Sequence, residues 1–204
     1  MFRLIKIQLF SLIFVLCTFG LAHSQSTDDP IIKVKLSTIA GEIYMDLYAS
    51  KAPITVRNFL KYVDGGHFKG GAFYRVVRTD NQAQNNIKIE VIQGGVGREE
   101  DRKMLIDPIP LERTIKTGLK HLDGTLSMAR DGPDTASSEF FICIGDQPSL
   151  DFGGMRNPDG QGFAAFGQVT KGMDVVRKIQ NMNSNPSSPQ YLNQPVMFQS
   201  LSRE

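Results

Sequence analysis

Short segments with a two-residue hydrophobic period recur along this chain, and only two segments show the period of a helix. In residues 31–38 (IIKVKLST), Ile32, Val34 and Leu36 alternate with two lysines. Residues 42–48 (EIYMDLY) repeat the alternation after a short turn. Because successive side chains of a strand point to opposite faces, these two segments predict a β-hairpin with one buried face.

The rest of the chain continues this pattern. Further strands are predicted at 72–78, 87–93, 125–130, 139–145, 163–169 and 194–204, and a loop at 183–190. One helix is predicted from Pro53, with apolar residues at 56, 59, 60 and 63, and a second over 172–182. Since strands and helices do not alternate regularly, the pattern favours an antiparallel barrel or sandwich over a parallel sheet.

The N-terminus has a different character from the rest of the chain. Residues 1–24 combine a basic start, an apolar run and small residues before the end, as secretory signal peptides do. A membrane anchor is the alternative, although polar residues interrupt the run and it is shorter than the roughly 20 residues that span a bilayer. We expect cleavage after Ser24, a polar leader at 25–30 and one domain at 31–204. This predicts an exported protein, periplasmic or secreted.

Charge and cysteine content restrict the partners and the covalent structure. The chain has 23 Lys and Arg and 21 Asp and Glu, and the predicted cleavage removes Arg3 and Lys6, which makes the two totals equal. Nothing here favours nucleic acid or an anionic membrane as a partner. Only Cys143 remains after cleavage, so no internal disulfide forms, and we expect this residue to be buried in its apolar strand.

Hydrolytic or metal-dependent chemistry has little support in the sequence. The two histidines of the predicted domain, His67 and His121, lie in turn-like segments, where we expect both to be solvated. No Gly-x-Ser-x-Gly motif surrounds Ser127 or Ser138. No His, Cys, Asp or Glu spacing typical of a metal site appears, so we predict neither a metal nor a cofactor.

Polar residues on otherwise apolar strands indicate a different kind of site. Strand alternation places Phe73 on the face of Arg75, and Tyr74 on the opposite face with Val76. If Val76, Ile92, Phe140 and Ile142 fill a barrel, the residues that point outward are Arg75, Val91, Gln93, Glu139 and Phe141. An apolar floor edged by hydrogen-bonding groups is typical of a binding groove, but an ordinary solvated arginine is an equally good interpretation of this pattern.

Several of these segments resemble the cyclophilin-type peptidyl-prolyl isomerases. FYRVV is similar to the family's Phe-His-Arg-Val-Ile, and IQGG to its Gln-Gly-Gly. GTLSMARDGPDTASSEFFI and the later FAAFGQVTKGMDVVRKI follow further family blocks almost residue by residue. The resemblance runs from about residue 31 to the C-terminus, and the order of the blocks is that of the family.

The resemblance implies a closed eight-stranded antiparallel barrel capped by two helices, with a groove on its outer surface. Arg75 takes the place of the catalytic arginine, and Gln93 binds substrate backbone and helps to hold Arg75. Ala129 and the backbone of Arg130 contact the residues before proline. The residues implied for the proline pocket are Val91, Phe141, Leu150 and Phe163, and Glu139 is a further substrate-binding residue.

This chain also departs from the family pattern. Glu90 and Ser149 stand where aromatic residues are usual, and Arg130 and Glu139 replace Asn and Gln. Glu139 could pair with either Arg75 or Arg130. Two loops, 78–88 and 152–162, are longer than usual and are expected to flank the groove.

The function that we expect is isomerisation of X-Pro bonds in proline-containing peptides and unfolded exported proteins. A non-catalytic peptide-binding or chaperone module is the alternative, because the pocket is altered at Glu90 and Ser149. We also expect a monomer, and weak binding of cyclosporin because the chain has no Trp.

Overall fold

A computed structural model describes residues 31–97 and 107–204 of the chain. The predicted signal peptide and polar leader, residues 1–30, lie outside the described residues. Among the helices within the described ranges, none is both long enough and apolar enough to cross a membrane.

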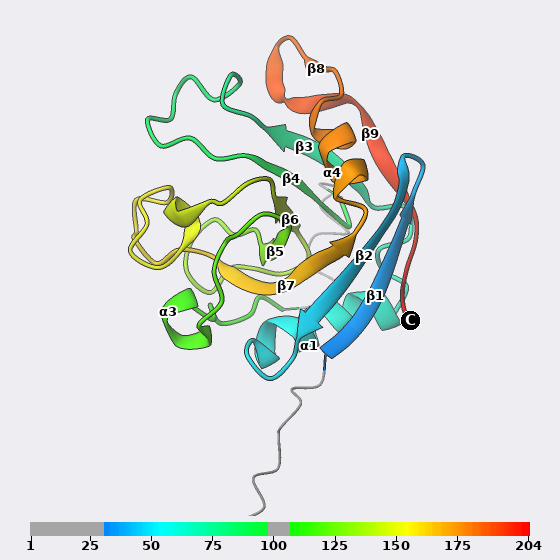
Figure 1. Cartoon of the computed structure of the whole chain (residues 1–204), viewed down its shortest axis with the longest axis vertical. Helices are drawn as coiled ribbons and strands as arrows, with labels where there is room; N and C mark the ends of the chain where they lie inside the picture. The colour runs from blue at the N-terminus through cyan, green and yellow to red at the C-terminus, as the bar shows by residue number, and fades with distance from the viewer. Residues whose placement is uncertain (1–30, 98–106) are drawn as a thin grey trace, which may run out of the picture.

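Eight antiparallel strands close into a barrel (Figure 1). Their order around the barrel is β1-β2-β7-β5-β6-β4-β3-β9, and pairing of β1 with β9 closes the sheet. The strand bounds are β1 Ile31–Thr38, β2 Gly41–Tyr48, β3 Ala72–Val77, β4 Val91–Gly95, β5 Thr125–Met128, β6 Phe140–Cys143, β7 Ala164–Lys171, β8 Ser184–Asn185 and β9 Ser188–Arg203. The two-residue β8 pairs only with β9, so the closed barrel has the eight strands that were expected.

Three predicted boundaries were wrong. The segment expected to be a loop at 183–190 forms the β8–β9 hairpin instead. The strand expected at 87–93 begins only at Val91. Before Val91, a side chain of the preceding loop takes the place of a partner strand, since the Gln82 Nε2 donates to the Ile89 carbonyl at 2.7 Å. The last strand begins at Ser188, six residues earlier than expected, because its first part pairs with β8 and β3.

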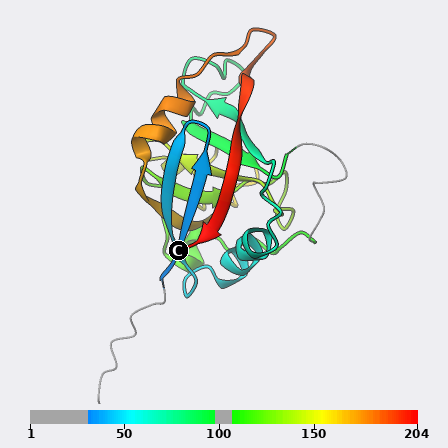
Figure 2. The same cartoon turned by 90° about the vertical axis from the view of Figure 1, so that its right-hand side faces the viewer.

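Two of the helices are those predicted from sequence, α1 (Pro53–Asp64) and α4 (Met173–Gln180). Figures 1 and 2 show them covering different ends of the barrel, where α1 contacts β2, β7 and β9 and α4 contacts β2, β3 and β4. Within the described residues the structure adds a one-turn helix, α3 (Thr114–Thr117), and the 3-10 helix η1 (Pro148–Leu150). The two capping helices expected from sequence are therefore confirmed, and the two added turns are only four and three residues long, too short to show a hydrophobic period.

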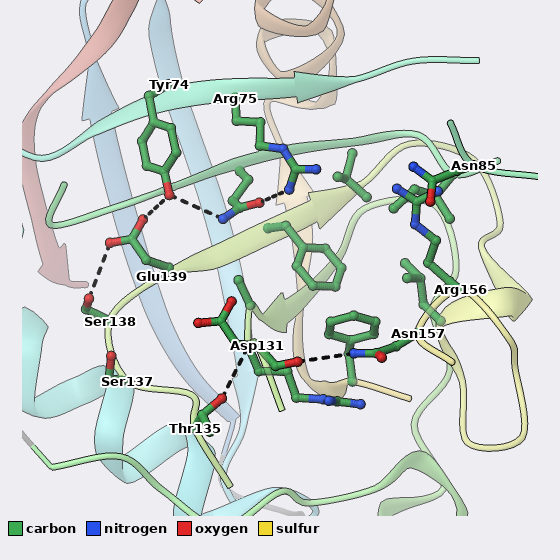
Figure 3. Close-up of a pocket in the computed structure, with 18 of the residues that line it drawn as sticks. Tyr74, Arg75, Asn85, Asp131, Thr135, Ser137, Ser138, Glu139, Arg156 and Asn157 are labelled. Carbon is green, nitrogen blue, oxygen red and sulfur yellow. Dashed lines mark hydrogen bonds between the residues drawn. The ribbon is translucent and has the colours of Figure 1, made fainter. Parts of the chain in front are cut away.

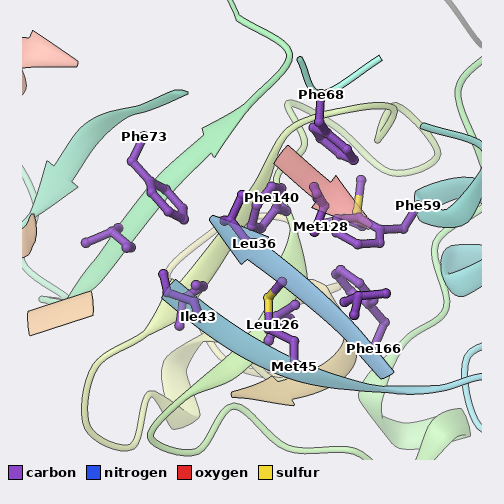
Figure 4. Close-up of a cluster of buried hydrophobic side chains, with 14 of the residues drawn as sticks. Leu36, Ile43, Met45, Phe59, Phe68, Phe73, Leu126, Met128, Phe140 and Phe166 are labelled. Carbon is purple, nitrogen blue, oxygen red and sulfur yellow. The ribbon is translucent and has the colours of Figure 1, made fainter. Parts of the chain in front are cut away.

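Apolar side chains fill the barrel interior, so it is a packed core rather than a channel. Figure 4 shows aromatic rings converging there from α1, β6 and β7, with the centroid of Phe59 5.4 Å from Phe140 and 5.1 Å from Phe166. Val76, Ile92, Phe140 and Ile142 all belong to this core, as the alternation of the strands predicts. A substrate must therefore bind outside the barrel.

A β-bulge in β3 changes the predicted alternation at one position. The pairing of β3 with both β4 and β9 shifts register between Phe73 and Arg75, which leaves Tyr74 as the extra residue. Phe73 is buried in the barrel core, while Tyr74 and Arg75 both face the outer groove. The predicted shared face of Phe73 and Arg75 was wrong, because simple alternation assumes an unbulged strand.

Candidate active site

A groove of about 750 Å³ lies on the outer face of the barrel (Figure 3). All nine residues proposed from sequence line it: Arg75, Val91, Gln93, Ala129, Arg130, Glu139, Phe141, Leu150 and Phe163. They come from β3, β4, β6, η1 and the segments that follow β5 and η1. The fold thus brings together positions as far apart in sequence as Arg75 and Phe163.

The floor of the groove is a separate apolar cluster outside the barrel core. Its buried members are Val77, Ile89, Val91, Phe141, Cys143 and Leu150, with Ala129 and Phe163 packed against them. Phe141 and Phe163 meet edge to face, with ring centroids 5.5 Å apart. Burial raises the pKa of the Cys143 thiol, so this residue is a small apolar filler beneath the floor, as expected.

Ile89 is a floor residue that the sequence analysis missed. Glu90 stands where an aromatic residue is usual in the family, but it is not among the residues that line the groove. The Glu90 carboxylate instead accepts a hydrogen bond at 3.4 Å from Gln180 of α4. The preceding residue, Ile89, supplies the apolar surface, because the longer loop before β4 carries it over Val91.

Two glutamine side chains hold the guanidinium of Arg75. Its Nη1 donates to Oε1 of Gln93 at 2.6 Å. Its Nε and Nη2 both donate to Oε1 of Gln190, at 3.0 and 2.5 Å. The contact with Gln93 was expected, whereas Gln190 was not, because it lies 115 positions away on β9 and has no motif around it.

Each glutamine is itself oriented by a further contact. The Gln93 Nε2 donates to the Tyr74 hydroxyl at 3.2 Å, and the Gln190 Nε2 donates to the backbone carbonyl of Asn81 at 3.3 Å. Because an amide donates only from nitrogen and accepts only at oxygen, these contacts turn both carbonyl oxygens towards Arg75. Asn81 belongs to the longer loop after β3, so that loop helps to fix the arginine.

Glu139 binds neither of the arginines considered from sequence. Its Oε2 accepts from the Tyr74 hydroxyl at 2.7 Å, and its Oε1 accepts from the Gly97 backbone N–H and the Ser138 hydroxyl at 3.3 Å each. Burial raises the pKa of Glu139, and these hydrogen bonds only partly oppose that effect. Tyr74 therefore connects a buried carboxyl group to Gln93 and, through Gln93, to Arg75.

Arg130 ties the groove to the longer loop that follows η1. Its Nη1 and Nη2 donate to both carboxylate oxygens of Asp159, at 2.7 and 2.9 Å, and its Nε donates to the Gly162 carbonyl at 2.9 Å. The guanidinium carbon lies 4.9 Å from the ring centroid of Phe163. The Arg130 side chain is thus held by the loop. The family resemblance implies that the Arg130 backbone, rather than this side chain, contacts the substrate.

His121 is buried, so the expectation that it is a solvated loop residue was wrong. Its Nδ1 lies 2.8 Å from Asp151 and its Nε2 lies 2.9 Å from the Ser127 hydroxyl. Burial raises the pKa of Asp151, but the hydrogen bonds from His121 and the charge interactions with His121 and Lys120 together outweigh this effect, so the net pKa is lowered. This arrangement has the connectivity of a hydrolase triad, yet Ser127 is 0 % exposed and no substrate reaches it.

The buried histidine supports the floor of the groove from behind. Its ring stacks on Phe141, with centroids 6.0 Å apart and planes 17° apart. Its sequence signal was weak, because the short turn around it contains no apolar period. His67, the other histidine of the predicted domain, contacts Tyr62 away from the groove.

The described residues contain no group of three or more His, Cys, Asp or Glu side chains arranged to hold a metal ion. The side chains that line the groove present a guanidinium, amides, a phenol, a carboxyl group and an apolar floor.

Comparison with known proteins agrees with this geometry. Residues 31–198 match the model of the cyclophilin type peptidyl-prolyl cis-trans isomerase family. The chain is 35% identical over 189 residues to peptidyl-prolyl cis-trans isomerase A of Dickeya dadantii, which covers 91% of this chain and 90% of the relative. It is 36% identical over 155 residues to peptidyl-prolyl cis-trans isomerase B of Escherichia coli, covering 76% and 87%.

A solved structure supports the fold independently. The cyclophilin type peptidyl-prolyl cis-trans isomerase of Cryptosporidium parvum superposes with a TM-score of 0.65 at 23% identity, covering 86% of this chain and 98% of that one. With the family match over most of the described residues, these comparisons establish that the chain belongs to the cyclophilin-type peptidyl-prolyl cis-trans isomerase family.

Proposed function

We propose that this chain catalyses cis–trans isomerisation of X-Pro peptide bonds by stabilising the twisted amide with Arg75. Family membership supports the reaction class. The observation that carries the mechanism is the position of Arg75: its guanidinium is held by two amide oxygens at the edge of an apolar floor that can accept a proline ring.

The barrier of the reaction explains why such a group is sufficient. Rotation about the amide bond costs about 18–20 kcal/mol, because the nitrogen lone pair is conjugated with the carbonyl group. In the twisted state the lone pair is localised on nitrogen and becomes a hydrogen-bond acceptor. A donor placed at that nitrogen therefore binds the transition state better than either planar isomer, which is the requirement for catalysis.

Arginine suits this role better than a titratable donor. The guanidinium stays protonated at all physiological pH values and presents its N–H groups in a fixed plane. Gln93 and Gln190 hold that plane in one orientation before substrate arrives, so little reorganisation is needed during rotation. No covalent intermediate or proton transfer is part of the proposal.

We propose the remaining roles from the same geometry and from the family resemblance. Val91, Phe141, Leu150 and Phe163 receive the proline ring, and Ile89 extends this surface. Ala129 and the backbone of Arg130 contact the residues before proline, while Gln93 binds substrate backbone. Glu139, which lines the groove, is a further substrate-binding residue, and it also orients Gln93 through Tyr74.

The test is an isomerisation assay on residues 25–204 with a proline-containing peptide, for wild type, Arg75→Ala and Arg75→Lys. We expect Arg75→Ala to lower kcat/KM by about a hundredfold or more, as expected for a lost transition-state donor. Arg75→Lys should recover little, because one ammonium group cannot reproduce the planar contacts with both glutamines. Wild-type activity in Arg75→Ala would refute the proposed mechanism.

The alternative is a module that binds proline peptides without isomerising them. The absence of an aromatic side chain at Ser149, which is not among the groove-lining residues, favours it. The same preparation distinguishes the two functions. Peptide binding by NMR titration together with an uncatalysed isomerisation rate would support the binding module.

The basic start and apolar run of residues 1–24 support export of this chain to the periplasm or the extracellular medium. We propose unfolded exported chains as the substrates, and a monomer as the active form. Fractionation of cells that express the full chain tests the location, and loss of export in a chain lacking residues 1–24 is the expected result.

Weak binding of cyclosporin is also proposed, because Ser149 replaces the usual aromatic residue. Titration of the wild-type chain and Ser149→Trp with cyclosporin tests this. We expect the substitution to tighten binding at least tenfold, and an already tight wild-type complex would contradict the proposal.

A further inference from the structure

Arg156 lies in the longer loop after η1 and lines the same groove as Arg75. Its Nη1 donates to Oε1 of Gln82 and to the Ile87 carbonyl, at 2.7 Å each, and its backbone N–H donates to the Ser149 carbonyl at 3.2 Å. Gln82 and Ile87 belong to the other longer loop. Arg156 therefore joins the two loops directly beside the floor of the groove.

The acceptors that hold Arg156 are all uncharged. Within residues 31–97 and 107–204, no ion pair joins Arg156 to a carboxylate. Arg130, in the same groove, is by contrast neutralised by both carboxylate oxygens of Asp159. Burial and the nearby charge of Arg75 both lower the pKa of Arg156.

The two ends of the groove differ in charge. Figure 3 shows Tyr74, Ser138 and Glu139 at one end, and Asn85 and Arg156 at the other. The apolar floor that contains Phe141 belongs to the same groove. A ligand group that passes from this floor towards Arg156 meets a guanidinium and an amide, a combination that favours a carboxylate.

We propose that Arg156, with Asn85, forms an anion subsite that selects substrates with an acidic side chain on the carboxyl side of proline. The inference rests on the proposed function for the direction of the bound chain, because residues before proline are assigned to Ala129 and Arg130. The end of the groove at Arg156 is then available to the substrate residues that follow proline. The Arg156 Nη1 is anchored by Gln82 and Ile87, so its charge is already in position when the substrate binds.

The test compares peptides that differ only in the residue after proline: Glu, Gln or Lys. For the wild-type chain we expect kcat/KM to be about threefold to tenfold higher for Pro-Glu than for Pro-Gln, as for a partly exposed charged hydrogen bond. Pro-Lys should be the poorest substrate. Raising the salt concentration should reduce the difference, because ions screen exposed charges.

Two variants and one control isolate the contribution of Arg156. In Arg156→Gln the ratio of kcat/KM for Pro-Glu to kcat/KM for Pro-Gln should fall to about one. In Arg156→Lys this ratio should stay above the value for Arg156→Gln. Arg177→Gln removes an exposed arginine that pairs with Asp123 outside the groove, and it should leave the ratio unchanged. The neutral Pro-Gln peptide reports whether the loops still fold correctly in each variant.

A wild-type ratio of one, or a preference that survives in Arg156→Gln, would overturn the inference. An equal preference for Glu placed before proline would also overturn it, since that result contradicts the assigned direction. Peptide affinity measured by NMR titration separates the two proposals. If isomerisation is absent, the proposed function fails, while a tighter complex with Pro-Glu that Arg156→Gln abolishes would still support the subsite.

Discussion

The hydroxyl group of Tyr74 donates a hydrogen bond to the buried carboxyl group of Glu139 at 2.7 Å and accepts one from Gln93 at 3.2 Å. An ionised carboxylate can only accept a hydrogen bond, so the Tyr74 hydroxyl donates to Glu139 and its oxygen accepts from the Gln93 amide nitrogen. The Gln93 carbonyl oxygen must then face Arg75. Tyr74 thereby sets the orientation of Gln93, the residue that is proposed to bind substrate backbone.

Tyr74→Phe tests this relationship. Loss of the hydroxyl leaves Glu139 and Gln93 without a shared partner, so we expect a loss of about 1–3 kcal/mol in the free energy of unfolding. Catalytic efficiency should fall about tenfold, because the amide of Gln93 is no longer held in one orientation. Urea unfolding and the isomerisation assay measure the two effects. Tyr44→Phe is the matched control, since its hydroxyl bonds the exposed Glu42 far from the groove, and an equal effect there would contradict the prediction.

Glu139→Gln should change how stability depends on pH. Burial raises the pKa of Glu139 in the folded state, so between the unfolded and folded pKa values the native chain binds more protons than the unfolded chain. The wild type should therefore lose stability from this group as pH rises through that window, and the variant should not.

The measurement is the urea midpoint from about pH 2.5 to pH 7, which covers the ordinary glutamate pKa and the ranges below and above it. Glu42→Gln provides a control of opposite sign, because the hydrogen bond from Lys35 lowers the pKa of Glu42. That group stabilises the fold above its unfolded pKa and stops doing so as pH falls through its folded pKa. If the urea midpoints of wild type and Glu139→Gln depend on pH in the same way, Glu139 does not cause the pH dependence of stability.

Gln190→Leu should weaken catalysis with little effect on binding. The substitution removes the oxygen that accepts from both Nε and Nη2 of Arg75. We expect kcat to fall about tenfold while KM changes less than twofold, as for a group that acts only in the transition state. Gln199→Leu, at an exposed position of the same strand, is the control. A change confined to KM would instead assign Gln190 to substrate binding.

Ser127→Ala should destabilise the fold without removing any hydrolytic activity. Ser127 is fully buried and bonds His121, so the variant leaves a buried ring nitrogen without its partner, at a cost of about 1–3 kcal/mol. A serine-reactive phosphonate probe should fail to label the native wild-type chain, because the hydroxyl is inaccessible. Labelling of the native wild type that Ser127→Ala abolishes would mean that this triad is a working nucleophile.

The sequence alone determined the strand-rich barrel, its interior face and the residues on its outer face. Hydrophobic alternation and the family motifs are local, so Val76 and Ile92 could be placed inside, and Arg75 and Gln93 together outside, without coordinates. The way Arg75 is held depends on contacts between segments that are far apart in the chain. The bulge at Tyr74 changes which side chains share a face, and no residue type marks it in the sequence. Gln190 contacts Arg75 from a distant strand, and Arg156 lines the groove from an irregular loop. Such contacts depend on strand register and loop conformation rather than on any periodic pattern.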